Sequence, residues 1–81
     1  MSENTARSTL SILARNEPGT LVKVATVISG RGLNIHEMIA RVSNNPQYTL
    51  INIDFLGDTE KLRQVQVQLE KLEVVKEVTP L

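Results

Sequence analysis

Two stretches of the chain alternate between apolar and more polar residues with a period of two. Over residues 8–15 the shared face carries Leu10, Ile12 and Ala14. Over residues 48–55 it carries Thr49, Ile51, Ile53 and Phe55. This period is typical of a strand that buries one face and leaves the other at the surface. We therefore predict a strand over each stretch, and the second pattern is the clearer of the two.

Two other stretches repeat their apolar residues with the period of an α-helix. The first covers about 18–29, and its predicted buried stripe consists of Leu21, Val24, Ala25 and Ile28. The second follows Asp58, a good N-cap residue, and its stripe consists of Leu62, Val65, Leu69 and Leu72. Residues 30–32, with the sequence Gly-Arg-Gly, supply the left-handed stop that commonly ends a helix.

The remaining apolar residues predict two more strands. One begins near Asn34, where Ile35 is out of phase with a later set formed by Met38, Ala40 and Val42. A β-bulge or a late strand start near His36 reconciles the two phases. Residues 43–47 have the composition of a turn, so this strand and the next one form a hairpin. The last strand contains Val74, Val75 and Val78 and is predicted to end before Pro80.

The elements follow one another in the order β-α-β-β-α-β. With right-handed crossovers, this order gives an α+β chain of the ferredoxin-like type. We expect a four-stranded antiparallel sheet in the order 4-1-3-2, with both helices on one face. The opposite face carries Leu13, Tyr48 and Leu50, more apolar residues than a water-facing surface needs. We expect that face, or a strand edge and the helix beside it, to contact a second copy of the chain.

The stretch 15–21, with the sequence Arg-Asn-Glu-Pro-Gly-Thr-Leu, joins the first strand to the first helix. Pro18 suits the first helical turn, so the helix is predicted to begin there. Gly19 has no Cβ and leaves the N–H groups of Gly19, Thr20 and Leu21 open at the positive end of the helix dipole. Asn16 either caps the helix or turns its amide toward a ligand. The junction is thus a candidate anion site, or an ordinary capped turn.

The composition excludes several kinds of chemistry. At 81 residues without cysteine, the chain forms one small domain that buries only roughly 60% of its unfolded surface, so oligomerisation is the expected added source of stability. His36 is the single histidine, which excludes a histidine-based metal cluster. Four acidic residues are spread over several elements and are interpreted as solvated surface: Glu37, Asp54, Asp58 and Glu60. We predict that the chain is not an enzyme, holds no metal and uses no cofactor.

The charge balance and the aromatic content argue against nucleic acid as a partner. Nine acidic and nine basic residues give no net field, and Tyr48 is the only tyrosine beside one phenylalanine. Single-strand binders on this kind of sheet need aromatic platforms and basic flanks. No apolar run is long enough to span a bilayer, and the start of the chain lacks the features of a signal peptide. We expect a cytoplasmic protein with a disordered segment at 1–7 and a protein or a small molecule as its partner.

Several short motifs together resemble one known family. They are Asn16-Glu17-Pro18-Gly19-Thr20-Leu21 through Val24, Arg31-Gly32-Leu33-Asn34-Ile35, Gly57-Asp58, and Gln68-Leu69-Glu70-Lys71-Leu72 before Val75 and Val78. The chain is identified by these motifs as an ACT domain over residues 8–79. It most resembles that of the regulatory small subunit of acetolactate synthase, also called acetohydroxyacid synthase.

The resemblance implies a homodimer that binds a branched-chain amino acid, usually valine, at the dimer interface. It also implies a catalytic subunit that the small subunit activates and, with the effector bound, makes feedback-inhibited in branched-chain amino acid biosynthesis. The effector-binding positions carried over to this chain are Asn16, Pro18, Gly19, Thr20, Leu21, Asn34 and Ile35. Their amide N–H groups suit a carboxylate, and the amide oxygens of the two asparagines suit an ammonium group.

Other interpretations remain open from the sequence. The chain could be a ligand-free activating or scaffolding subunit, or a small acylphosphatase-like enzyme for which Arg15 and Asn52 are the only loose candidates. His36 stands where the family more often has Glu, and it either contacts a ligand or partner or is a surface or turn residue. Long members of the family carry a second domain, so the chain corresponds to a short-type subunit, an isolated domain or a diverged paralogue.

Overall fold

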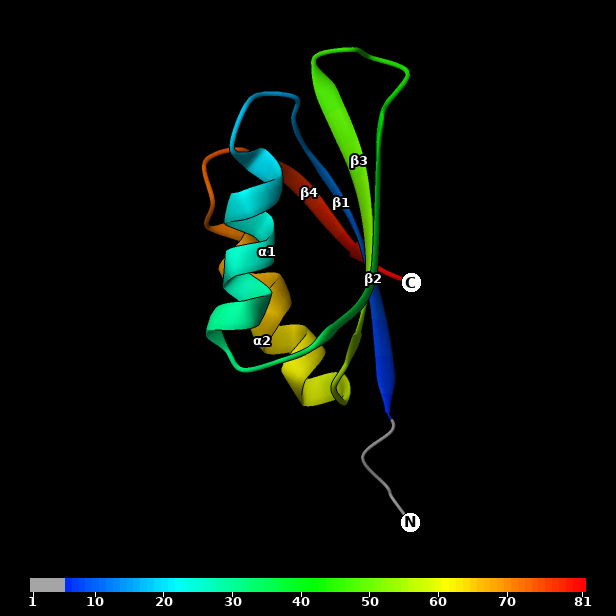
Figure 1. The fold of residues 1–81 in the computed structure, drawn as a ribbon, viewed down its shortest axis with the longest axis vertical. Helices are drawn as coiled ribbons and strands as arrows, with labels where there is room; N and C mark the ends of the chain where they lie inside the picture. The colour runs from blue at the N-terminus through cyan, green and yellow to red at the C-terminus, as the bar shows by residue number, and fades with distance from the viewer. Residues whose placement is uncertain (1–5) are drawn as a thin grey trace.

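The computed structural model describes residues 6–81 and contains the six predicted elements in the predicted order. They are β1 (Arg7–Arg15), α1 (Thr20–Gly30), β2 (Ile35–Val42), β3 (Tyr48–Leu56), α2 (Thr59–Glu70) and β4 (Val75–Pro80). The strands form one antiparallel sheet in the order β2-β3-β1-β4. Both helices pack on the same side of this sheet (Figure 1). The predicted ferredoxin-like fold and the strand order 4-1-3-2 are confirmed.

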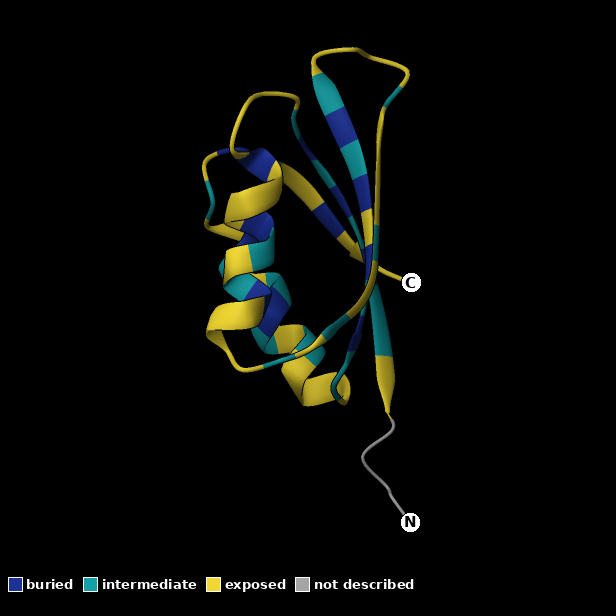
Figure 2. Ribbon diagram, in the orientation of Figure 1, coloured by how far each residue is buried: buried dark blue, intermediate teal, exposed yellow. Residues whose placement is uncertain are grey.

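The core lies between the sheet and the two helices. Strand residues of the predicted inward faces are fully buried, namely Leu10, Ile12, Ala14, Ile51, Ile53 and Phe55, and Thr49 is nearly so. The helices contribute Val24, Ile28, Val65 and Leu69. Figure 2 shows this buried layer on the facing sides of α1, α2 and the central strands. The alternation in the sequence therefore predicted the buried face correctly, because period-two side chains must share one side of a sheet.

The predicted helix α1 differs from the observed one at its N-terminal end. The helix begins at Thr20 rather than at Pro18, because Gly19 takes the left-handed conformation, with φ of 87°, and serves as the N-cap residue. Leu21 was predicted to be buried and is instead 43% exposed. At the other end Gly32 also has a positive φ of 75°, as the Gly-Arg-Gly stop predicted.

Several other predicted boundaries need small corrections. β1 begins at Arg7, one residue before its predicted start, and the O of Ala6 accepts a hydrogen bond from the N–H of Gly57 at 2.9 Å. The rest of the predicted disordered segment 1–7, residues 1–5, lies outside the described residues. Helix α2 ends at Glu70 instead of Leu72, and β4 includes Pro80.

Strand β2 contains the predicted bulge but is less buried than its pattern indicated. Its register with β3 shifts between Ile35 and Glu37, so His36 is the extra residue, and its side chain is exposed. Ala40 and Val42 lie on the side of the sheet that carries the helices, yet both are exposed. Figure 2 shows this half of the edge strand as exposed, because α1 does not cover it. The uncovered part of β2 forms one wall of the site described next.

Candidate effector site

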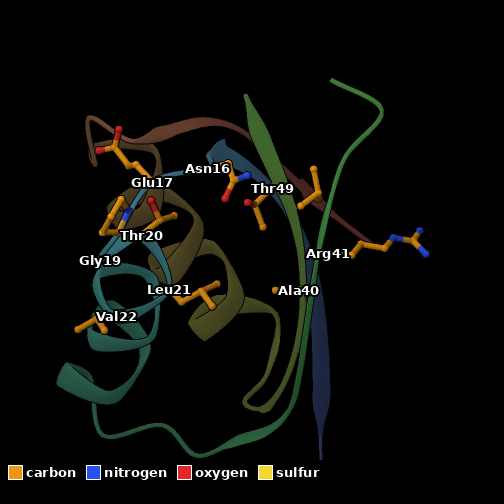
Figure 3. A pocket seen from close by; sticks show the side chains of 11 residues that line it. Asn16, Glu17, Gly19, Thr20, Leu21, Val22, Ala40, Arg41 and Thr49 are labelled. Atoms are coloured by element: carbon orange, nitrogen blue, oxygen red, sulfur yellow. The ribbon is translucent and has the colours of Figure 1, made fainter. Parts of the chain in front are cut away.

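A cavity of about 460 Å³ lies between the start of α1, the end of β2 and the start of β3. Its lining consists of Asn16, Glu17, Pro18, Gly19, Thr20, Leu21, Val22, Ala40, Arg41, Val42 and Thr49. Figure 3 shows that the two walls face each other, with Leu21 on α1 directed toward Ala40 on β2. The cavity forms because the chain turns from β1 into α1 at the same end of the sheet as the β2–β3 hairpin.

Five of the seven predicted effector-binding residues line this cavity, and two do not. Residues 16 and 18–21 belong to the lining. Ile35 begins β2 and Asn34 precedes it, at the opposite end from Val42, roughly 25 Å away at the usual rise of ~3.3 Å per strand residue. Within one chain the structure therefore does not bring the two predicted groups together.

The start of α1 has the electrostatic features of an anion site. Within residues 6–81 the backbone N–H groups of Gly19, Leu21 and Val22 donate no hydrogen bond. The helix has no side-chain cap and no acidic residue in its first turn, and the carboxylate of nearby Glu17 faces the guanidinium group of Arg15, so the helix itself carries no anion that offsets its dipole. Amide groups at such a terminus bind carboxylate and phosphate groups. A carboxylate placed here would therefore gain both hydrogen bonds and a favourable dipole.

Thr20 has a structural role, and the prediction that its N–H is open was wrong. That N–H donates to the O of Glu17 at 3.3 Å, and the Oγ1 hydroxyl donates to the O of Arg15 at 2.8 Å. The residue is only 3% exposed. These two bonds close the turn between β1 and α1: the first pairs the N–H of Thr20, and the second adds a donor to the O of Arg15, which also accepts from the N–H of Glu17 at 3.0 Å. Thr20 thus holds the shape of the site.

Asn16 connects the junction to the β2–β3 hairpin and does not cap the helix. Its backbone N–H donates to the O of Gln47 at 2.8 Å, and its side-chain Nδ2 donates to the O of Pro46 at 3.1 Å. The second of these bonds orients the side-chain amide. Its Oδ1 accepts no hydrogen bond from the described residues and is the atom available to an ammonium group.

The charged residues around the junction are mostly directed away from the cavity or paired with each other. Nε of Arg15 lies 3.2 Å from Oε1 of Glu17, and Nη2 of Arg15 lies 3.9 Å from Oε2 of Glu73. The Arg15–Glu17 contact has the distance of an ion pair but lacks hydrogen-bond geometry. Figure 3 shows the guanidinium group of Arg41 pointing away from the cavity. The recognition of charge in the cavity therefore rests on backbone amides and on Asn16.

The apolar wall was only partly identified from the sequence. Val22, Ala40 and Val42 line the cavity beside Leu21, and the side chain of Val22 is 68% exposed. Ala40 and Val42 are on the helix side of an edge strand, and the period-two alternation alone predicts that such positions are buried in the core. The signal that could have separated them is their place at the edge of the sheet, beyond the reach of a helix as short as α1. An exposed aliphatic wall next to an anion-binding helix terminus suits an aliphatic amino acid.

The residues considered for a phosphate site or a metal site do not come together in the structure. Arg15 pairs with Tyr48 in the sheet, whereas Asn52 pairs with Ser11 four residues further along β3, so these two do not form one phosphate site. No cluster of three or more metal-ligating side chains occurs in the part of the chain that the structure describes. None of the helices in residues 6–81 is long and apolar enough to cross a membrane.

Comparison with known proteins identifies the family. The model of the family described as the AHAS small subunit-like ACT domain matches residues 10–77. The chain belongs to this family. Residues of this ACT domain are 36% identical, over 75 positions, to the acetolactate synthase isozyme 3 small subunit of Escherichia coli, covering 93% of the chain and 46% of that relative. They are 35% identical to the acetolactate synthase small subunit of Haemophilus influenzae, covering 82% of the chain and 40% of the relative.

Solved structures agree with the family. The small subunit of acetolactate synthase from Thermotoga maritima superposes with a TM-score of 0.84 at 34% identity, over 91% of this ACT domain and 46% of that chain. The ACT domain from GTP pyrophosphokinase of Chlorobium tepidum superposes with a TM-score of 0.77 at 22% identity and supports the fold alone. The ACT domain described here spans about half the length of the curated relatives it matches.

Proposed function

We propose that this ACT domain is a regulatory module that binds valine or a related branched-chain amino acid and modulates a catalytic subunit of acetolactate synthase. In this role the chain is a cytoplasmic, non-catalytic regulatory subunit in branched-chain amino acid biosynthesis. The observation that carries it is the cavity at the β1–α1 junction. One side of this cavity offers unpaired backbone amides, and the other offers exposed aliphatic side chains.

The parts of an amino acid match the parts of the cavity. The carboxylate accepts hydrogen bonds from the N–H groups of Gly19 and Leu21, and the helix dipole adds to this attraction. The ammonium group donates to Oδ1 of Asn16, which the Nδ2–Pro46 hydrogen bond keeps in position. A branched aliphatic side chain packs against Leu21 and Val42, whose exposed surface is removed from water.

A second copy of the chain completes this site. Leu21 on α1 and Val42 on the edge strand β2 expose apolar surface side by side. Two β2 strands that pair antiparallel about a twofold axis place the start of one beside the end of the other. Asn34 and Ile35 of the second copy then lie near the junction of the first, and this explains why a single chain keeps the two groups apart. The homodimer and the shared site are thus one proposal.

Calorimetric titration with valine, leucine and isoleucine tests the ligand. We expect heat from at least one of the three and a dimer in solution by sedimentation equilibrium. Absence of heat and of any thermal shift with all three amino acids would remove effector binding.

A mixing experiment tests the shared site. Gly19→Asp disables one half of each site and Asn34→Ala disables the other, so neither homodimer binds. A mixed dimer contains one site built from two intact halves. Random exchange of subunits should therefore restore roughly a quarter of the wild-type sites, because half of the dimers are mixed and each has one intact site of two. No recovery after confirmed exchange would show that each site belongs to one chain.

The alternative of a ligand-free activating or scaffolding subunit has one observation in its favour. One of the predicted ligand groups, the N–H of Thr20, is already used in an internal hydrogen bond, and the side chain of Asn16 also donates within the chain through its Nδ2. Rescue of a catalytic subunit by this chain, without sensitivity to any branched-chain amino acid and without heat in the titration, would favour that alternative.

A further inference from the structure

A second depression lies away from the effector site, between the end of α1 and residues 61–68 of α2. One part of it, of about 350 Å³, is lined by Thr26, Val27, Gly30, Arg31, Lys61, Gln64 and Gln68. The adjoining part, of about 210 Å³, is lined by Arg31, Arg63, Gln64, Val67 and Gln68. Three residues are common to the two linings, so the two parts form one continuous depression, here named the α1–α2 groove.

The α1–α2 groove concentrates positive charge, although the chain as a whole has no net charge. Arg31, Lys61 and Arg63 line it and are exposed, and its lining contains no acidic residue. Across residues 6–81 the ion pairs within 4.0 Å involve only Arg7 and Arg15 as cations. The whole sequence carries nine acidic and nine basic residues, so the excess in the groove is local. Three unpaired cations within one groove attract an anionic partner.

The stability of the helix does not account for Lys61. Lys61 lies in the first turn of α2, where the helix dipole disfavours a cation. Arg31, by contrast, follows the end of α1 and there has a favourable interaction with the dipole. Asp58 at the N-cap and Glu60 in the first turn offset this cost, so the helix tolerates Lys61 at this position without requiring it.

The groove also has an apolar component. Val67 is 45% exposed, and Val27 is half-buried beside the groove. On α2, Lys61, Gln64 and Gln68 follow helical spacing along one line, and Arg63 and Val67 follow it along the next. Cations, amide groups and a valine thus alternate over about two helical turns. This arrangement suits a protein segment that carries both carboxylates and aliphatic side chains more than it suits a nucleic acid, which would use aromatic stacking and has no aliphatic groups to bury.

We infer that the α1–α2 groove docks an acidic, amphipathic segment of the catalytic subunit of acetolactate synthase. The identity of the partner rests on the proposed function, whereas the chemistry of the segment follows from the groove. Carboxylates of the segment contact Arg31 and Lys61, and its aliphatic side chains contact Val67. The docking surface is separate from the effector cavity, since the two linings share no residue.

Charge reversal in the groove tests the inference. The double variant Arg31→Glu with Lys61→Glu is compared with the wild type in a titration against the purified catalytic subunit of the same organism. We expect the dissociation constant to rise at least about tenfold at low salt, because like charges then face each other. Raising the salt concentration should weaken the wild type more than the variant. Lys76→Glu is the matched control: its Nζ lies 5.1 Å from the ring of Tyr48, on the other face of the sheet, and its affinity should stay within about twofold.

The outcomes separate this inference from the proposed function. Equal affinity of the wild type and the double variant overturns the docking groove and leaves the regulatory function in place. No binding of the catalytic subunit by the wild type overturns both. Amino-acid binding by the double variant should equal that of the wild type, and its loss would show a general disturbance and so count against the groove. If the double variant fails to fold, the neutral pair Arg31→Gln with Lys61→Gln is measured instead, and a loss of at least about threefold is expected.

Discussion

Both helices follow a strand and begin with a threonine, yet their N-termini are built differently. Helix α2 begins at Thr59 after Asp58, whose carboxylate accepts a hydrogen bond from the N–H of Lys61 at 3.0 Å. Helix α1 begins at Thr20 after Gly19, with no side-chain cap and no acid in its first turn. The start of α2 therefore carries its own anion, whereas the start of α1 does not.

This difference indicates which terminus is available to a ligand. A side-chain carboxylate at the N-cap satisfies amide groups and the helix dipole, and it stabilises a helix by about 1 kcal/mol. At α1 that contribution is missing, and the turn is closed instead by the hydrogen bonds of Thr20. The amides of α1 thus remain available to a carboxylate from outside the chain. The predictions below change one helix start at a time, in order of decreasing expected effect.

Gly19→Asp should give the largest effect, on ligand binding. We expect amino-acid affinity to fall at least about a hundredfold, or about 3 kcal/mol, because a like charge then occupies the place of the ligand carboxylate. Folding should survive at a cost of about 1–3 kcal/mol: a Cβ at Gly19 meets no atom within 4 Å, but φ of 87° strains any L side chain, and Asp is among the residues that tolerate this strain best. Titration calorimetry measures the affinity.

Gly19→Asn is the matched control for this variant. It has the same size and the same backbone preference without the charge, so its affinity should fall by less than about tenfold. An equal loss in the two variants would mean that shape, and not charge, decides binding at this position.

Thr20→Val should lower the stability of the fold by about 1–2 kcal/mol, because the O of Arg15 loses its hydroxyl donor in a nearly buried position. Thr59 occupies the corresponding position of α2 and is exposed. Thr59→Val should therefore change stability by less than about 0.5 kcal/mol. Urea denaturation compares the two, and equal effects would contradict the structural role given to Thr20.

Asp58→Ala should lower stability by about 1 kcal/mol through loss of the helix cap and leave amino-acid binding unchanged, since Asp58 is remote from the effector cavity. Asp58→Asn keeps a capping oxygen and should restore most of the lost stability. Thermal melts with and without valine check both statements. A change in valine affinity in either variant would mean that the N-terminus of α2 also contributes to amino-acid binding.

The fold was predictable because its signals are local. Ile51, Ile53 and Phe55 are fully buried as their alternation predicted, and Asp58 caps α2 as its residue type predicted. The bulge near His36 was predictable from the change of phase between Ile35 and Met38. In each case the pattern constrains neighbours along the chain, whose relative directions are fixed by strand or helix geometry.

The site was predictable in its centre and not in its surroundings. The Pro-Gly junction identified five residues that line the cavity, although the helix starts two residues later than expected. The orientation of Asn16 could not be read from the sequence, because its hydrogen-bond acceptor, the O of Pro46, is 30 residues away. The exposure of Val42 could not be read either, because alternation tells which side of the sheet a residue is on but not whether a helix covers it.

The sequence by itself determined the six elements, the strand order and the family, since periodicity, caps and motifs act between residues close in the chain. The tertiary structure alone decided that the end of β2 stays uncovered beside the start of α1, and that Asn34 lies at the far end of the same strand from the cavity. It also decided that the cations of α1 and α2 share one groove. These features depend on how far each helix extends over the sheet, and packing sets that extent only when all six elements are in place.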